Sequence, residues 1–495
     1  METVLGIDLG TQHLKVVFYD FTARRLLAVE SSPLEVHRDA AGSAEQHAHW
    51  WTDALRGALG RIDAEVRRSV RAIGVSGQQH GFVPIDRSGE VLVPVKLWCD
   101  TSTASDCQSI MEACGGPDVC VEVAGNLLLP GYTASKVRWF RRAHPALYRR
   151  LDCILLPHDY LNFYLTGERC MEMGDASGTG FLDVRRRQWS DQMLRAIDPD
   201  RDLRECLPRL RSANEAIGVL RADVALLLGL PAGTPVSIGG GDNMMAAIGT
   251  GNVAQGQMTI SLGTSGTVYA YSETPVADPT GHVAAFCSSN GGWLPLLCMM
   301  NCTVSTELMR DLLGASIADF EAQISGAAPG ADGVLTVPFF NGERTPNLPN
   351  AKGSLFGLDS RNTRSENLLR STVEGVTFAL RSGVDELARL GVRPANIVVT
   401  GGGVKSPTWR QLLADVCNSR VTVLEQEEGA AFGAALQALA LLVAQPALPI
   451  EPLVREHLTR DEARCCVPDA GAVDFYAETY HRYQRAVGAV SALYS

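Results

Sequence analysis

A short segment that ends in a Gly-Thr turn occurs twice, once in each half of the sequence. Ile7-Asp8-Leu9-Gly10-Thr11 near the N-terminus reappears in mid-chain as Ile260-Ser261-Leu262-Gly263-Thr264. Each copy closes an apolar run with strand character and leads into a second such run. A fragment repeated once per half predicts two related domains that face each other across a central cleft. Because glycine lets the backbone approach a ligand and the N–H groups of such a turn suit phosphate, both turns are candidate phosphate sites.

The length of the chain also predicts more than one domain. A chain of 495 residues is too long for a single core. Strand-like runs alternate with runs of helical spacing, which indicates α/β layers. We place the boundary between a first domain of residues 1–247 and a second domain of residues 248–495. Apolar residues near the C-terminus predict an amphipathic helix that packs on a domain, with a return to the first domain as one option.

Composition argues against several classes of partner. The net charge of −11 argues against nucleic acid, whose phosphates attract basic surfaces. The sequence has no apolar run of about 18 residues, so we expect no membrane span. The N-terminus lacks the order of a signal peptide, and the 13 cysteines form no CxxC pair. We therefore expect a cytoplasmic protein with reduced cysteines rather than a zinc site.

Local patterns predict individual elements. Apolar runs predict three consecutive strands over residues 3–8, 14–19 and 26–30, followed by a helix over residues 50–66. In the second half, Thr363 with Glu366 three residues later fits the capping box of a long helix.

Four glycine-rich turns each follow a predicted strand. They are Gly10-Thr11, Gly239 to Asn243, Gly263 to Gly266 and Gly401 to Gly403. Open α/β sheets bind ligands at the carboxyl ends of their strands. We therefore expect these turns to contribute to ligand sites.

Two of the turns carry a carboxylate, and each carboxylate has two alternative roles. Asp242 is either a general base or a cap for the helix that follows it. Asp8 lies where the second copy of the repeat has Ser261. A carboxylate beside phosphate groups suits a Mg²⁺ ion between them, and the alternative is that Asp8 caps its turn.

The order of these motifs resembles the FGGY family of carbohydrate kinases, and within it most of all the members that phosphorylate xylulose. The resemblance covers the chain from residue 6 to about residue 435. The matching stretches are Gly6–Thr11, Ser76–Gly81, Leu97–Asp100, Gly125-Asn126, Pro130–Lys136, Asp175–Thr179, Gly240–Asn243, Ser261–Gly266, Gly342–Pro346, Gly401–Gly403 and Ser406–Arg410.

The resemblance implies a fold and an activity. It implies two actin-like, ribonuclease-H-like ATPase domains and transfer of the ATP γ-phosphate to a ketopentose, with D-xylulose 5-phosphate as the expected product. Ribulose and glycerol are alternative substrates. An actin- or chaperone-like nucleotide switch that binds protein partners is the alternative from another class, and a catalytically inactive sugar sensor is a third. The expected partners are the sugar and ATP, and a homodimer is the assembly under consideration.

The resemblance also implies roles for particular residues. Asp242 becomes the general base and Asp8 the Mg²⁺-binding residue. The sugar-binding candidates are Gln78, Gln79, His80, Trp98, Asp100, Asp242 and Asn243. The nucleotide-binding candidates are Gly10, Thr11, Gln12, Lys15, Gly263, Thr264, Ser265, Gly401, Gly402, Gly403 and Ser406.

Two of these assignments have open alternatives. Lys15 lies inside a predicted strand, so it either contacts phosphate or faces solvent. Gln79 stands where related kinases usually carry Met. Either its side chain faces the sugar and influences the choice among ketopentoses, or only its backbone matters.

Overall fold

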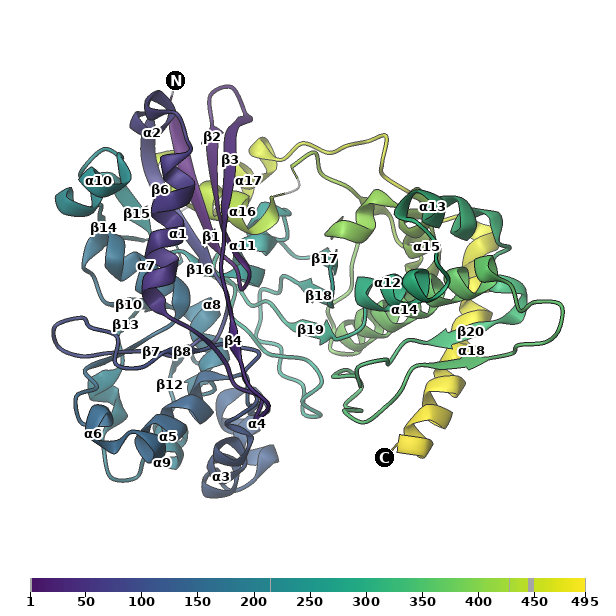
Figure 1. The fold of residues 1–495 in the computed structure, drawn as a ribbon, viewed down its shortest axis with the longest axis horizontal. Helices are drawn as coiled ribbons and strands as arrows, with labels where there is room; N and C mark the ends of the chain where they lie inside the picture. The colour runs from purple at the N-terminus through teal and green to yellow at the C-terminus, as the bar shows by residue number, and fades with distance from the viewer. Residues whose placement is uncertain (1, 214, 427, 444–448, 495) are drawn as a thin grey trace. The chain divides into compact units, whose positions relative to one another are not determined.

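The computed structural model describes residues 2–213, 215–426, 428–443 and 449–494 (Figure 1). The chain forms two compact units. Unit 1 comprises Met1–Ala254, Ser272–Leu294 and Glu428–Leu458, and unit 2 comprises Gln255–Tyr271, Pro295–Glu427 and Thr459–Ser495. This division differs from a single boundary after residue 247, because two later segments return to unit 1.

Unit 1 is built on a mixed sheet whose first three strands form an antiparallel meander. These are β1 (Thr3–Leu9), β2 (His13–Asp20) and β3 (Arg25–Pro33), which confirms the three predicted strands. On its other side β1 pairs in parallel with β6 (Val70–Gly77). The strand order is β14-β15-β6-β1-β2-β3, with β14 at Ala216–Val219, β15 at Pro235–Ser237, and β16 (Gly240–Gly241) also on β6.

Unit 2 repeats this arrangement around the second Gly-Thr turn. Its strand order is β19-β18-β17-β22-β23, with an antiparallel meander and then parallel pairs. The strands are β17 (Gln257–Leu262), β18 (Gly266–Ala270), β19 (Leu296–Met299), β22 (Asn396–Thr400) and β23 (Val421–Thr422). Since β17 occupies the position of β1, the repeated segment marks equivalent strands, as the sequence predicts.

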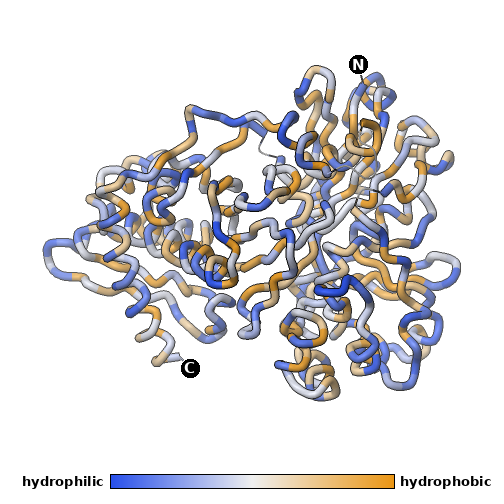
Figure 2. The backbone as a smooth tube through the Cα atoms, turned by 180° about the vertical axis from the view of Figure 1, so that it is seen from behind, coloured by the Kyte–Doolittle hydropathy of each residue, from blue (hydrophilic) through white to orange (hydrophobic). Residues whose placement is uncertain are grey.

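Helices cover both faces of the unit 1 sheet. Leu5, Ile7 and Leu9 of β1 pack with α1 (Ala48–Gly60) and α7 (Pro157–Thr166). On the opposite face Val4 packs with α16 (Gly429–Val443), and α11 (Asp242–Gly249) joins the same apolar cluster. The alternation along β1 therefore gives the sheet two buried faces, and hydrophilic residues concentrate in outer loops and helices (Figure 2).

Helix α16 lies unusually close to the sheet and to α11. A Cβ atom on Gly74 would lie 2.0 Å from the carbonyl oxygen of Ala434, and one on Gly6 would lie 1.9 Å from that of Ala431. A Cβ on Gly433 of α16 would likewise lie 1.8 Å from the Met245 carbonyl oxygen. Glycine at these positions therefore allows a helix from late in the chain to complete unit 1.

Two local predictions are wrong. The helix expected over residues 50–66 is two helices, because α1 ends at Gly60 and Asp63 then caps α2 (Ala64–Arg68) by accepting from Glu65 N. The expected capping box does not form, because the Thr363 hydroxyl donates to the Asp359 carbonyl oxygen at 2.6 Å and α14 (Ser365–Arg389) has no side-chain cap.

The C-terminal helix packs within unit 2. Helix α18 (Ala470–Tyr494) lies against α14 and α15 (Pro407–Cys417). Its buried Tyr476, Tyr480 and Tyr483 surround Phe378 of α14, with ring centroids 5.4–6.3 Å away. The predicted apolar stripe is thus a core-facing stripe.

Shorter elements complete the two units. In unit 1 they include β4 (His37–Arg38), β5 (Ala44–Gln46), β7 (Val83–Ile85), β8 (Val95–Lys96), α3 (Ala104–Cys114), α4 (Pro117–Ala124), α5 (Thr133–Ala143), α6 (Pro145–Tyr148), β9 (Cys153–Leu155), β10 (Cys170–Glu172), α8 (Met173–Ala176), β11 (Leu182–Asp183), β12 (Gln188–Trp189), α9 (Asp191–Ile197), β13 (Arg209–Arg211), α10 (Ala222–Leu228) and α17 (Glu451–His457). In unit 2 they include α12 (Thr303–Leu312), α13 (Ile317–Gly326), β20 (Leu335–Val337) and β21 (Ser354–Phe356).

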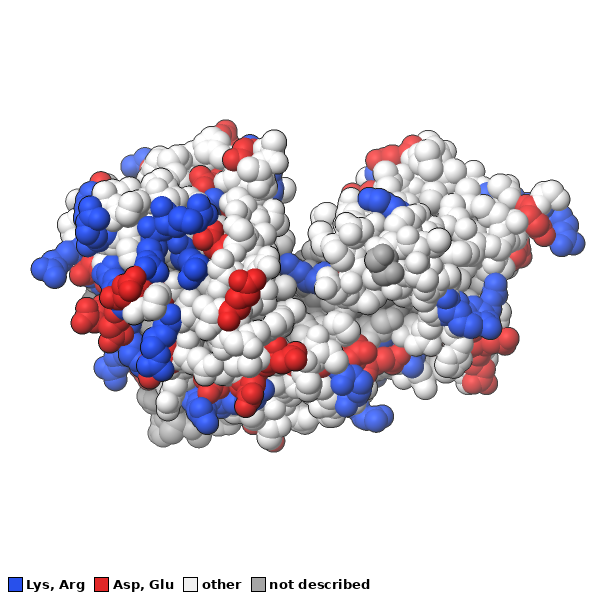
Figure 3. Space-filling model, turned by 90° about the horizontal axis from the view of Figure 1, so that it is seen from below, with Lys and Arg blue, Asp and Glu red and all other residues white. Residues whose placement is uncertain are grey.

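Charges of both signs are interspersed on the surface. Figure 3 shows basic and acidic side chains next to one another on the face seen from below. Ion pairs of α5, such as Arg142 with Asp106 at 2.8 Å and Arg141 with Asp198 at 3.2 Å, are examples of this mixing. Within the described ranges, no helix combines the length and the hydropathy that crossing a membrane requires.

Candidate active site

Asp8 lies near the carboxyl end of β1, beside the matching end of β6. The Ser76 hydroxyl of β6 donates to Asp8 Oδ1 at 2.8 Å. Burial raises the pKa of the Asp8 carboxyl above its ordinary value, although the hydrogen bond from Ser76 opposes this shift. Lys15, directly opposite Asp8 on β2, forms an ion pair with Glu428 at the start of α16. The region around Asp8 therefore contains a second carboxylate and a cation.

Asp242 is the first residue of α11 and follows β16, which pairs with the end of β6. Its Oδ1 accepts hydrogen bonds from the backbone N–H of Asn243 at 2.7 Å and from Asn243 Nδ2 at 3.0 Å. Among the described residues, Oδ2 has no hydrogen-bond partner. Asp242 is not the cap of this helix, because Gly241 is the N-cap and α11 has no side-chain cap. One oxygen of Asp242 bonds the next residue, and the other remains available for the base role.

Burial raises the pKa of Asp242 to about 7, and the charge of Asp8 adds to the shift. A neighbouring carboxylate that raises the proton affinity of Asp242 also makes the surroundings favourable for a cation. No group of three or more His, Cys, Asp and Glu side chains with metal-site geometry occurs in the part of the chain that the structure describes. The single carboxylate of Asp8 nevertheless fits Mg²⁺, because this ion usually retains water and substrate phosphate among its ligands.

Gln78 is a buried link between several candidate residues. Its backbone N–H donates to the Leu9 carbonyl oxygen at 2.7 Å, and its Nε2 donates to Gln46 Oε1 at 2.9 Å. The Thr11 hydroxyl donates to Gln78 Oε1 at 3.1 Å. Trp98, which is 37% exposed, donates from Nε1 to the Thr11 hydroxyl at 3.0 Å. The structure therefore joins Thr11, expected at the nucleotide, to residues expected at the sugar.

The side chain of Gln79 reaches the Asp242 turn. Its Oε1 accepts from Asn243 Nδ2 at 2.8 Å, and its Nε2 contacts the Met244 sulfur at 3.2 Å. Because Asn243 Nδ2 also donates to Asp242, an amide chain connects Gln79 to the candidate base. Of the two alternatives for Gln79, this contact favours a role for the side chain.

Asp100 differs from the other sugar candidates because its side chain is fully buried and engaged. Oδ2 accepts from Lys96 Nζ and from Ala44 N, both at 2.9 Å. Oδ1 accepts from the Ser102 hydroxyl at 2.6 Å and from Ser102 N at 3.0 Å. These contacts make Asp100 an anchor of its own turn, and they do not favour direct sugar binding.

The remaining nucleotide candidates of unit 1 lie in the β1–β2 turn. The Gly10 N–H donates to the His13 carbonyl oxygen at 3.0 Å, which closes the turn. The Gln12 residue is exposed, and its carbonyl oxygen accepts from Leu34 N at 2.7 Å. Lys15 neither points into open solvent nor stands unpaired, because Glu428 holds its ammonium group.

The nucleotide candidates of unit 2 come from two touching turns. Gly401, at φ +91°, would place a Cβ 2.7 Å from the Leu262 carbonyl, directly before Gly263-Thr264-Ser265. A Cβ on Gly402 would meet nothing within 4 Å, so space is open beside this turn. Ser406 instead caps α15, since its hydroxyl accepts from Trp409 N at 3.0 Å and donates to Glu321.

The structure adds buried residues to which the sequence assigned no role. His158 lies between Asp159 and Asp175, with nitrogen–oxygen distances of 3.0 Å to each. Lys136 donates to the carbonyl oxygen of His80 at 2.8 Å. Asp175 and Lys136 both belong to stretches that resemble the kinase family, and this is the signal that could have indicated them.

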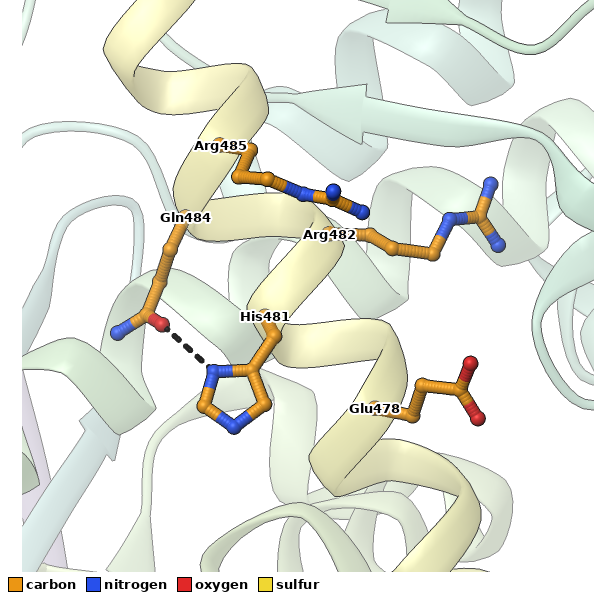
Figure 4. Close-up of a pocket in the computed structure, with 5 residues that line it drawn as sticks. All are labelled: Glu478, His481, Arg482, Gln484 and Arg485. Carbon is orange, nitrogen blue, oxygen red and sulfur yellow. Dashed lines mark hydrogen bonds between the residues drawn. The ribbon is translucent and has the colours of Figure 1, made fainter.

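A separate hollow occurs on α18 (Figure 4). Its lining residues are Glu478, His481, Arg482, Gln484 and Arg485, and His481 Nδ1 lies 3.2 Å from Gln484 Oε1. None of the predicted site residues lines it.

Family models match both halves of the sequence. The N-terminal domain of the FGGY family of carbohydrate kinases matches residues 3–249, and the C-terminal domain matches residues 258–442. The chain belongs to the FGGY family of carbohydrate kinases. The resemblance expected from the sequence is confirmed, and with it the expectation of an enzyme that phosphorylates carbohydrate.

Known relatives of this FGGY kinase cover nearly its whole length. It is 43% identical to a xylulose kinase of Haemophilus influenzae over 97% of this chain and 98% of the relative. It is 38% identical to a xylulose kinase of Escherichia coli over 92% and 94% of the two chains. A solved xyloylose kinase of Brucella ovis, 30% identical, superposes with a TM-score of 0.91 over 99% of this chain and 100% of that one. The predicted α/β fold with two actin-like ATPase domains is confirmed.

Proposed function

We propose that this FGGY kinase transfers the γ-phosphate of ATP to D-xylulose and produces D-xylulose 5-phosphate and ADP, with Asp242 as the general base. The observation that carries the proposal is the half-buried Asp242 carboxylate, which accepts from the Asn243 amide that also donates to Gln79. Its pKa of about 7 suits a base that works near neutral pH. Xylulose kinases at 43% and 38% identity support the choice of sugar.

The reaction needs little covalent chemistry from the protein. Asp242 accepts the proton of the attacking sugar hydroxyl, the hydroxyl oxygen bonds to the γ-phosphorus, and the bond to the ADP oxygen breaks. Asn243 holds Asp242 by its backbone N–H and its side-chain amide. The Gln78–His80 segment supplies polar groups for the sugar, whose hydroxyls need fixed hydrogen-bond partners for discrimination.

Asp8 would hold Mg²⁺, which would supply charge neutralisation at the transferring phosphate when bound. The Gly10-Thr11 turn of unit 1 and the Gly263–Ser265 turn of unit 2 are proposed to bind nucleotide phosphates through backbone N–H groups. The open space beside Gly402 suits the adenine or the ribose of the nucleotide.

A kinase for ribulose or glycerol is the alternative within the family. A coupled ADP-release assay with the purified full chain, over D-xylulose, D-ribulose, L-ribulose, D-ribose and glycerol, tests both. We expect the highest kcat/KM with D-xylulose. A preference for glycerol or ribulose would contradict the assigned sugar, and ATP turnover that is independent of every sugar would contradict the kinase assignment.

A further inference from the structure

Lys136 of α5 carries a fully buried ammonium group that is not paired with an acid. Its Nζ donates to the carbonyl oxygens of His80 at 2.8 Å and Gly131 at 2.7 Å. Among the described residues, no carboxylate lies within ion-pair distance of it. Burial lowers the pKa of Lys136 to about 7, which reflects the cost of placing this cation away from water. A lysine in such a place is unfavourable for the fold by itself and therefore calls for a specific role.

The backbone of His80 has an unfavourable conformation that hydrogen bonds from Lys136 and its neighbours can stabilise. Its φ of +63° lies in the left-handed region, which non-glycine residues seldom adopt. The His80 carbonyl oxygen accepts from Lys136 and also from the Thr133 hydroxyl at 3.1 Å. Its backbone N–H faces Asp175 Oδ1 at 3.4 Å. Side chains on two other elements thus hold both polar groups of the His80 backbone.

The imidazole ring of His80 sits in a closely fitted place. A Cβ atom on Gly178 would lie 1.7 Å from the His80 ring carbon Cε1. The rings of Tyr132 and Phe286 lie with their centroids 5.0 Å and 5.6 Å away. Because the ring has little room, it can keep this place only while the His80 backbone keeps its conformation. A change at the His80 carbonyl should therefore move the imidazole.

We propose that Lys136 is a positioning residue for sugar binding, which acts by fixing the carbonyl oxygen of His80 and with it the direction of the imidazole. The proposal rests on the proposed function, since it requires that the Gln78–His80 segment meets the sugar. Lys136 itself does not contact the sugar. Thr133 supplies a second, uncharged donor to the same carbonyl oxygen; we call this pair of donors the His80 clamp.

Lys136→Met tests the proposal because it keeps the apolar stem and removes the donors. We expect the KM for the sugar to rise at least about tenfold, while the KM for ATP changes less than about twofold. In a His80→Ala background the same substitution should produce no further rise, because the group that Lys136 positions is absent. Equal effects in both backgrounds, or parallel changes of both KM values, would identify a merely structural lysine and overturn the proposal.

Thr133→Val gives a second route if Lys136→Met does not fold. It removes the other donor to the same carbonyl without changing charge, and the sugar KM should rise about two- to fivefold, again only when His80 is present. The matched control is Ser135→Ala in the same helix, since Ser135 donates to the Pro130 and Tyr132 carbonyl oxygens and not to His80. A sugar KM unchanged in Thr133→Val, or raised equally in Ser135→Ala, would overturn the clamp.

Wild-type turnover distinguishes a failure of the proposed substrate from a failure of the positioning role of Lys136. All KM values are measured with whichever sugar of the panel the wild-type enzyme phosphorylates best. If that sugar is not D-xylulose, the proposed substrate is wrong, and the coupling between Lys136 and His80 is still read from that sugar. If the wild-type enzyme phosphorylates D-xylulose but shows no coupling, only the positioning role is wrong. If no sugar is phosphorylated, both fail.

Discussion

Asp242 is the side chain on which the proposed chemistry depends most. Asp242→Asn keeps the size and the hydrogen bonds at the start of α11 but cannot accept the sugar proton. We expect kcat to fall by at least about 10², the usual contribution of a general base, with nucleotide affinity unchanged. Steady-state kinetics and nucleotide titration measure both quantities. Near wild-type turnover would show that another group takes the proton.

The pH dependence of the reaction should follow the same carboxyl. With its pKa raised to about 7 by burial, Asp242 is ionised above that pH and protonated below it. We therefore expect kcat/KM to fall about tenfold per pH unit below 7. Because the folded chain raises this pKa from 3.8, stability from the protonated form is lost as pH rises from 3.8 through about 7. At pH 8 the Tm of Asp242→Asn should equal or exceed that of wild type, and a clear decrease would contradict this assignment of charge.

Gln79 is the side chain that should adjust sugar preference. Its Oε1 bonds Asn243, which in turn bonds Asp242, so Gln79→Met should alter how both residues meet the sugar. We expect the ratio of kcat/KM between D-xylulose and D-ribulose to change by more than about threefold, a part of what one pocket contact supplies. Gln484→Met on α18 is the control and should leave the ratio unchanged. A constant ratio in Gln79→Met would restore the alternative in which only the backbone matters.

Helix α16 offers a direct test of close packing. Alanine is normally better than glycine inside a helix by about 0.5–1 kcal/mol, yet a Cβ on Gly433 would lie 1.8 Å from the Met245 carbonyl oxygen. We expect Gly433→Ala to lower the Tm, since overpacking typically costs about 1–3 kcal/mol. Gly488 of α18, where a Cβ would meet nothing within 4 Å, is the matched control, and Gly488→Ala should keep or raise the Tm. Equal shifts in both variants would contradict the role of the contact.

Local rules predicted the elements well where the decisive interactions are local. The meander of β1, β2 and β3 and the turn at Gly10 follow from apolar runs and glycine. The Thr363 capping box failed because the Thr363 hydroxyl bonds Asp359, a competing partner just before the helix. The break after Gly60 depends on the Asp63 cap, which an apolar pattern does not reveal.

Local sequence rules could not predict the contacts between residues that lie far apart in the sequence. A lysine in an amphipathic helix normally predicts an exposed face, so the burial of Lys136 against His80 had no signature of its own. The pairing of Lys15 with Glu428 likewise joins residues far apart in the sequence. Family resemblance located the candidate site, but it could not show that Asp100 and Ser406 are already engaged. The Mg²⁺ ion, the homodimer and the cytoplasmic location stay predictions.

The division into units predicts how fragments behave. A fragment of residues 1–254 lacks α16 and would expose the sheet face around Gly6 and Gly74. We expect it to show no cooperative unfolding when expressed alone. The same fragment joined by a flexible linker to residues 428–458 should regain a thermal transition, measured by circular dichroism. A cooperative transition in the shorter fragment would show that α16 is not needed.

Because α16 lies late in the sequence, it is synthesised well after the sheet that it covers. The ribosome finishes the sheet of unit 1 by residue 241, but the helix that covers it ends at residue 443. At the usual rate of about 5–20 residues per second, roughly 10–40 s separate these two events. During that interval an apolar sheet face stands uncovered on the nascent chain. We therefore expect the nascent chain of this kinase to bind chaperones that act at the ribosomal exit.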